Sequence, residues 1–92
     1  MKIGDIVAWR STSNGVEKEK RGKIVNIVPP HKGPLKYIVE AKEETGAAFS
    51  SSSGPGMSRD HESYIVHVPS KMGKGKGTLY WPKVRNLLIV ND

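Results

Sequence analysis

The sequence predicts an all-β fold, and three observations support this prediction. The apolar residues gather in six short runs, the runs are rich in Ile, Val, Tyr and Trp, and glycine, proline or charge bounds each of them. None of the runs reaches the length of a typical helix. With 92 residues, the chain is large enough for one domain, so we expect residues 1–92 to form a single domain of five to six short antiparallel strands. The runs are residues 2–9, 22–28, 35–41, 63–68, 78–81 and 87–90.

The first two strands are expected to flank a flexible hairpin loop. The polar segment 10–21 contains Asn14-Gly15, a strong turn signal because both residues tolerate positive φ. The second strand, residues 22–28, must end at Pro29-Pro30, since proline cannot donate to a ladder. Regular alternation places Ile24 and Val28 on one face and Val25 and Ile27 on the other. This pattern predicts a bulge or burial of both faces.

The middle of the chain predicts a third strand followed by a long loop. Residues 35–41 read as a strand with Tyr37 and Val39 on one face. Residues 43–62 contain four consecutive serines and Gly54-Pro55-Gly56, with almost no apolar side chain. Such a segment buries too little surface to order itself, so we expect 43–62 to be a flexible insertion.

The last third predicts a hairpin and a closing strand. Residues 63–68 form the fourth strand, a lysine-glycine loop spans 70–77, and residues 78–81 form the fifth strand. Pro82 cannot continue that strand, and residues 82–86 read as one helical or 3-10 turn. A short strand over 87–90 then completes the fold.

Composition narrows the classes of function. Fifteen Lys and Arg against nine Asp and Glu give a formal charge of +6, which favours polyanionic partners. The absence of cysteine excludes disulfides and thiolate chemistry, and it fits a reducing compartment. We see no signal peptide and no apolar run near the ~20 residues that span a bilayer. The expectation is a cytoplasmic protein with no membrane association and no cofactor.

The order of short motifs resembles the SH3-like small β-barrels, including Tudor, KOW and chromo-type domains. The motifs are Gly4-Asp-Ile-Val, Gly22-Lys-Ile-Val, Tyr37-Ile-Val-Glu and Tyr80-Trp-Pro, followed by one turn and a last strand. The likeness spans residues 3–42 and 63–90, with 43–62 as an insertion. It implies a small barrel with a 3-10 turn before the last strand, and such domains mostly bind nucleic acid or peptides.

The chain also looks somewhat similar to one SH3-like enzyme, the tetrameric type II dihydrofolate reductase. That enzyme builds its pore from a Val-Gln-Ile-Tyr strand. The matching residues here are Thr78-Leu79-Tyr80-Trp81, which lack the glutamine. The resemblance therefore implies an oligomeric enzyme only as a distant third interpretation.

The strongest candidate site is a basic stretch with adjacent aromatic residues. Three glycines in residues 72–78 let the backbone approach a phosphate, and the lysines supply charge. A regular strand turns Tyr80 and Trp81 to opposite sides, and we expect Tyr80 near the core and Trp81 at the surface, ready to stack on a base. The predicted nucleic-acid-binding residues are Lys71, Lys74, Lys76, Lys83, Arg85, Trp81 and Tyr80. The structural alternative is a solvated hairpin tip.

Other chemistry finds less support. His61 and His67 would lie ~20 Å apart on one extended segment, so we predict no metal site. The serine run with Asp60 and His61 has no Gly-x-Ser-x-Gly elbow, so we predict no catalytic residues. A second basic group consists of Lys18, Lys20, Arg21 and Lys23, and its charge is diluted by Glu17 and Glu19.

The sequence therefore predicts a non-enzymatic module that binds nucleic acid through its phosphates. The alternative is a protein-interaction module that offers a groove to a peptide or adds a strand at an exposed edge.

Overall fold

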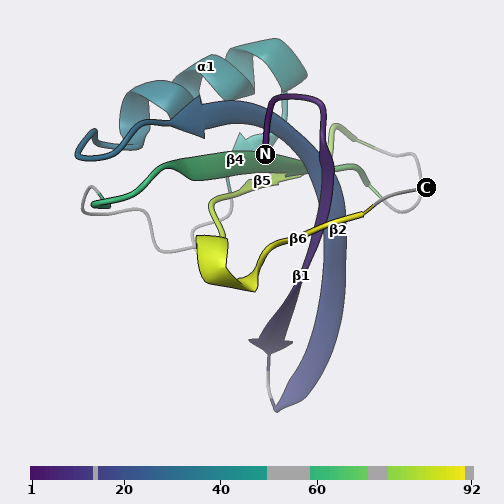
Figure 1. Ribbon diagram of the computed structural model, residues 1–92. Coiled ribbons are helices and arrows are strands. Elements are labelled where there is room, and N and C mark those ends of the chain that lie inside the picture. Colours follow the sequence, from purple (N-terminus) through teal and green to yellow (C-terminus); the bar gives the residue numbers. More distant parts are fainter. Residues whose placement is uncertain (14, 50–58, 71–74, 91–92) are drawn as a thin grey trace.

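One strongly curved sheet organises the chain, with a helix packed on one of its faces (Figure 1). We describe a computed structural model, and the structure describes residues 1–13, 15–49, 59–70 and 75–90. The strands are β1 (Ile6–Ser13), β2 (Val16–Val28), β3 (Ala48–Phe49), β4 (Ser63–Val68), β5 (Thr78–Tyr80) and β6 (Leu88–Ile89). The helix is α1 (Leu35–Thr45), and a 3-10 turn, η2 (Val84–Asn86), precedes β6.

The sheet is mixed and open. Its strand order is β3-β5-β4-β2-β1-β6, and all described pairs are antiparallel except β3 with β5. Among the described residues β3 and β6 are the two edges and do not pair, so the sheet is not a closed barrel. The prediction of a mostly-β fold is confirmed, and the prediction of barrel closure is wrong. The SH3-like resemblance itself stays a prediction.

The hairpin of β1 and β2 is longer than the sequence suggested. Pairing runs without interruption from Ile6↔Lys23 to Ser13↔Val16. Residues 10–13 and 16–21, predicted as loop, are therefore strand, and Asn14 lies outside the described residues. The interpretation as loop was wrong because the alternating charges of this segment are also compatible with a solvated strand, in which successive side chains take opposite faces.

A β-bulge in β2 explains how this strand fills two cores. Ile24 pairs with Val66 and Asn26 with Ile65, so one extra residue stands opposite β4. The bulge shifts the alternation by one position. Ile24 and Ile27 then face one side, while Val25 and Val28 face the other. Both predicted features, the bulge and the burial on both faces, are found. The prediction that Ile24 and Val28 lie on the same face of the sheet is wrong.

Residues 35–41, predicted as a strand, begin the helix α1. Ile38 and Ala41 are buried, and this i, i+3 spacing is the apolar stripe of a helix. The strand interpretation rested on Tyr-Ile-Val and neglected the helix formers Ala, Lys and Glu that follow. Gly46 ends the helix in the left-handed conformation, with φ of 75°, and its N–H donates to Lys42 O.

The bulge also holds the helix to the sheet. Asn26 Nδ2 donates to Tyr37 O at 3.0 Å and to Glu40 Oε2 at 3.2 Å, while Asn26 Oδ1 accepts from Ile27 N. One side chain therefore connects the irregular point of β2 to the first turns of α1.

The predicted loop 43–62 is structured at both of its described ends. Residues 43–45 complete α1, and Ala48 and Phe49 pair in parallel with β5. At the other end, Arg59 O accepts from His31 N, and the Arg59 side chain contacts Trp81. The interpretation as loop is wrong for residues 43–45 and 48–49, whereas residues 59–62 are neither helix nor strand, and residues 50–58 lie outside the described residues.

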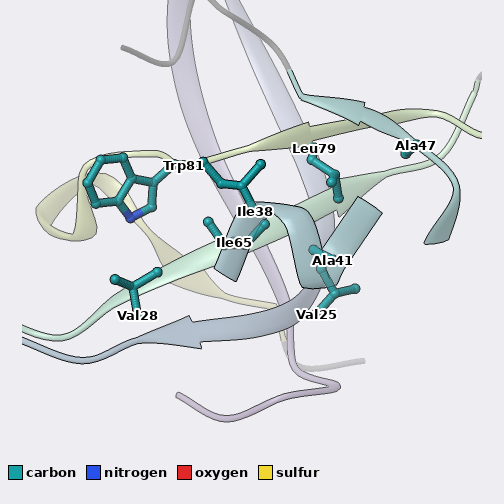
Figure 2. Packing of buried hydrophobic residues seen from close by; sticks show 8 residues of the cluster. All are labelled: Val25, Val28, Ile38, Ala41, Ala47, Ile65, Leu79 and Trp81. Carbon is teal, nitrogen blue, oxygen red and sulfur yellow. The ribbon is translucent and has the colours of Figure 1, made fainter. Parts of the chain in front are cut away.

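The two faces of the sheet carry separate hydrophobic clusters. Figure 2 shows the cluster under α1, in which Ile38 and Ala41 of the helix meet Ile65, Leu79 and other residues of the sheet. The second cluster, on the opposite face, contains Val7, Trp9, Ile24, Tyr64, Val66 and Leu87. The predicted fourth strand, 3-10 turn and last strand are all found near these clusters. In the described part of the chain no helix is long and apolar enough to cross a membrane.

Candidate nucleic-acid interface

The structure separates the basic residues that the sequence grouped together. Lys71 and Lys74 lie outside the described residues. Lys76 precedes β5, whereas Lys83 and Arg85 follow it, and all three side chains are exposed. Because an extended chain advances ~3.3 Å per residue, the two ends of this segment lie on the order of 20 Å apart. The predicted stretch is therefore not one continuous basic surface.

Trp81, predicted at the surface, is buried. Only 1% of it is exposed, and its Nε1–H donates to Ser63 Oγ at 2.8 Å (Figure 2 shows the indole in the helix-side cluster). The prediction of alternation was right, but the faces were assigned the wrong way round. The side of β5 that Trp81 shares with the helix is the more deeply covered one, so Trp81 is not available to stack on a base.

Tyr80 is the partly exposed aromatic of the pair. Its ring meets Trp9 edge to face, with centroids 5.6 Å apart and planes at 65°. Lys20 Nζ lies 4.2 Å from the centroid of the same ring. This cation–π contact brings the second basic group, from β2, to an aromatic side chain of β5.

The strand geometry of the hairpin sorts its charges by face. Trp9 pairs with Lys20 and Ser11 with Lys18, so both lysines belong to the face that meets Tyr80. Among the described residues neither lysine forms an ion pair. We call the hairpin face of Lys18, Lys20 and Trp9 the lysine face.

The acidic residues of the hairpin lie on its other face. Arg10 pairs with Glu19 in the ladder, Arg10 Nη1 lies 3.5 Å from Glu17 Oε1, and Arg21 Nη2 lies 3.8 Å from Glu19 Oε1. These side chains are 57–72% exposed, so each pair stabilises the fold by only about 0–1 kcal/mol. Their importance is electrostatic, because strand alternation places both glutamates on the face opposite to the lysine face, where arginines pair with them.

A groove runs from the hairpin to the start of β5. Its first part, about 640 Å³, lies between Lys18–Arg21 and residues 68–70, with Tyr80 in its wall. Its second part, about 420 Å³, continues to Gly75–Thr78. Both parts share Val68, Pro69, Ser70 and Tyr80, so they form one depression, which we call the Tyr80 groove.

Lys76, at the far end of this groove, also has a structural role. A Cβ added to Gly46 would approach Lys76 Cδ to 2.5 Å, which shows that the lysine stem crosses the helix C-cap. The positive charge near the carbonyl end of α1 is favourable. Lys76 is therefore partly committed to the fold, and Lys18 and Lys20 are the groove lysines with no such role.

Sequence reasoning missed Lys18 and Lys20 because it summed charge along the chain. Read with a period of two, Glu17-Lys-Glu-Lys already separates acids from bases. The missing step was to treat residues 16–21 as strand.

The histidines occupy separate settings. His61 Nδ1 lies 2.9 Å from Asp60 Oδ1, and this contact lowers the pKa of the Asp60 carboxyl. His67 Nε2 bonds Lys76 O at 2.7 Å, next to the groove. Within the described ranges no three His, Asp or Glu side chains gather closely enough to hold a metal ion.

In comparisons with known proteins, the chain matches no family model, no curated protein and no solved structure. The site must therefore be judged on its own geometry.

Proposed function

We propose that the protein is a non-enzymatic module that binds nucleic acid in the Tyr80 groove. The observation that carries this proposal is the contact of Lys20 with the half-buried Tyr80 ring, on a hairpin face where the lysines are separated from the acids. Clustered lysines beside an accessible aromatic suit a ligand that has both phosphates and bases.

Charge supports phosphate contact as the main source of affinity. Three lysines line the groove, Lys18, Lys20 and Lys76, and its lining also includes Glu19 and Arg21 from the opposite hairpin face. Glu19 is already paired with Arg21. Three phosphate contacts predict a slope of about −2 in a plot of log affinity against log salt concentration for a single strand of nucleic acid. Binding should therefore be strongly salt-dependent and weakly sequence-specific.

Tyr80 supplies the second part of the proposal. Lys20 Nζ lies over the partly exposed ring, and a cation–π contact at such a site is worth only about 0.5–1 kcal/mol. A base stacking on the ring gains about 1–3 kcal/mol. A base of single-stranded nucleic acid can therefore displace Lys20 from the Tyr80 ring, while the Lys20 ammonium group moves to a phosphate of the same ligand.

The deciding experiment exchanges the two hairpin faces without changing the composition. In the variant Glu17→Lys/Lys18→Glu/Glu19→Lys/Lys20→Glu, the formal charge stays +6 because two acids and two bases trade places. We expect at least a tenfold loss of affinity for labelled single-stranded DNA, measured by fluorescence anisotropy at two salt concentrations. Unchanged affinity would mean that net charge alone drives binding, and it would contradict the proposal that the Tyr80 groove is the binding site.

Two simpler variants control for the possibility that the four-residue exchange prevents folding. Lys18→Gln/Lys20→Gln removes the groove lysines, and Lys32→Gln/Lys36→Gln removes the same charge from the exposed surface at the start of α1. The first pair should weaken binding several-fold more than the second. Equal losses would contradict the proposal, provided that circular dichroism shows both variants folded.

A second candidate function rests on one specific observation, the open edge of β2. Pairing with β4 stops at Lys23↔His67, so residues 16–21 have a described neighbour, β1, on one side only. Such an edge can accept an added strand from a peptide or a second protein. Strand addition would depend little on salt and would survive Lys18→Gln/Lys20→Gln, and these two outcomes distinguish it from nucleic-acid binding.

A further inference from the structure

A second basic hollow lies at the opposite end of the β4–β5 pair from the Tyr80 groove. β4 begins and β5 ends at this end, whereas the groove adjoins the end of β4 and the start of β5. The hollow has a volume of about 300 Å³ and is lined by Arg59, His61, Lys83, Val84 and Arg85. None of these residues lines the Tyr80 groove, and no acidic side chain is among them.

Arg59 is fixed in place at this hollow. Its Nη1 donates to Pro82 O at 2.8 Å, its Nη2 donates to Trp81 O at 3.0 Å, and its guanidinium carbon lies 3.6 Å from the centroid of the Trp81 ring. The backbone is held as well, because Arg59 O accepts from His31 N. Among the described residues only two of the five N–H donors of this guanidinium have an acceptor, so up to three can bond a ligand.

The loss of hydration at the Arg59 guanidinium favours the binding of an anion in the hollow. Burial lowers the pKa of Arg59, which shows that the charged form loses hydration here. No carboxylate bonds the guanidinium among the described residues. Asp60, the neighbouring acid, is engaged with His61 Nδ1 and is largely exposed. An anion in the hollow would therefore give Arg59 a negative partner that the described residues do not supply.

Two further cations are carried by the turn that follows β5. Lys83 O accepts from Asn86 N and Val84 O accepts from Leu87 N, so η2 fixes the backbone that holds Lys83 and Arg85. Their exposed side chains flank Val84 at the mouth of the hollow. A rigid guanidinium with two adaptable cations is a suitable arrangement for the several oxygens of one phosphate group.

We propose that this hollow binds a single phosphate group with two negative charges, either inorganic phosphate or a phosphate monoester. Its volume is at the lower limit of ordinary ligand pockets, so a small ligand fits better than a polymer. The proposal does not depend on the Tyr80 groove. The sequence placed Lys83 and Arg85 in one basic stretch with Lys71, Lys74 and Lys76. In this proposal Lys83 and Arg85 bind a ligand other than the one in the Tyr80 groove.

Trp81 offers a built-in reporter for this site because it stacks on Arg59. In a Trp9→Phe background Trp81 is the single tryptophan, and its fluorescence can be followed while inorganic phosphate is added at constant ionic strength. We expect a saturable change with a dissociation constant of roughly 1 mM or below. A parallel titration with potassium chloride should give no saturable change. A linear response, or the same response to chloride, would overturn the proposal.

Paired variants locate the site. Lys83→Gln/Arg85→Gln should weaken phosphate binding at least about tenfold. Lys18→Gln/Lys20→Gln removes the same charge from the Tyr80 groove and should leave phosphate affinity unchanged. Equal weakening by both pairs would mean nonspecific attraction and would reject the hollow, whereas the oligonucleotide measurements judge the groove separately.

Two more ligands identify the source of the phosphate. A nucleoside monophosphate that binds more tightly than inorganic phosphate would identify an ester, and comparison of 5′-phosphorylated with unphosphorylated oligonucleotide would show whether a nucleic-acid end is bound. Equal affinity for inorganic phosphate and the monophosphate would assign the free ion. Each of these results requires the saturable Trp81 signal, so its absence with all ligands rejects the site.

Discussion

The two halves of β2 show how the same alternation serves two purposes. In the half from Gly22 to Val28, β2 pairs with β4, and its side chains enter two hydrophobic clusters. In the half from Val16 to Arg21, β1 is its only partner among the described strands, and its alternation separates lysines from glutamates. The inner half therefore contributes buried apolar side chains, and the outer half contributes charged side chains to the Tyr80 groove.

The largest effect should come from the inner half. Ile24 is fully buried, and Ile24→Ala removes most of its side chain from the second cluster. We expect a loss of about 2–5 kcal/mol in the free energy of unfolding, measured with urea. In the outer half, Lys18→Ala should change this free energy by no more than about 0.5 kcal/mol. Similar losses for both would show that the halves do not differ as described.

The junction between the halves should be sensitive to one methyl group. A Cβ at Gly22 would lie 2.5 Å from His67 O and 2.8 Å from Val66 Cγ1, where β4 crosses close to β2. Gly22→Ala should cost about 1–3 kcal/mol because a backbone carbonyl must move. Gly33→Ala is the matched control, since nothing lies within 4 Å of its added Cβ. A harmless Gly22→Ala would contradict the close approach.

Next to the inner half of β2, Tyr64 of β4 should make the free energy of unfolding decrease at alkaline pH. Tyr64 pairs with Ile27, and burial, with a hydrogen bond donated to Glu62, raises its pKa to about 12. Because the folded-state pKa exceeds the ordinary value of 10, this stabilisation is complete below pH 10 and is lost as the pH rises toward 12.

Tyr64→Phe tests this assignment. Between pH 9 and pH 12 the wild-type protein should lose on the order of 1–2 kcal/mol more than the variant in urea unfolding. Parallel pH curves for the two proteins would show that lysine deprotonation, not Tyr64, accounts for the alkaline loss.

The smallest effect on stability should come from the acids of the outer half. Glu17→Gln/Glu19→Gln breaks the exposed contacts to Arg10 and Arg21, and unfolding should change by less than about 1 kcal/mol. The same variant should bind single-stranded DNA slightly more tightly, because two negative charges leave the hairpin. A large loss of stability would mean that these ion pairs do more than separate the charges.

The sequence revealed the β character of the chain through local signals that tertiary structure preserved. Pro29-Pro30 ends β2, Pro82 ends the β5 segment, and Asn14-Gly15 lies between β1 and β2. The prediction from sequence was wrong where the same residues fitted both the period of two of a strand and the period of 3.6 of a helix. Residues 35–41 carry β-branched residues, yet their i, i+3 spacing and the glycine at 46 decide for a helix once the sheet offers an apolar surface.

The site was harder to predict because it depends on which face of a strand is covered. Tyr80 and Trp81 were correctly placed on opposite sides, but only the position of α1 explains why Trp81 is the buried one. Arg59 could not be linked to Trp81 at all, since 22 positions separate them. Contacts of this kind arise from the fold and leave no signature in a local stretch of sequence.

The shortness of β6 has a consequence for self-association. Two ladder pairs attach it to β1, with a further hydrogen bond from Val90 N to Ile6 O, and its two residues are 70% and 47% exposed. Brief local opening of so small a strand is far less costly than global unfolding. Each opening uncovers backbone groups of Val7 and Ala8 that another molecule's strand can pair with. The tendency to aggregate at high concentration therefore depends on how firmly two residues hold the edge of the sheet.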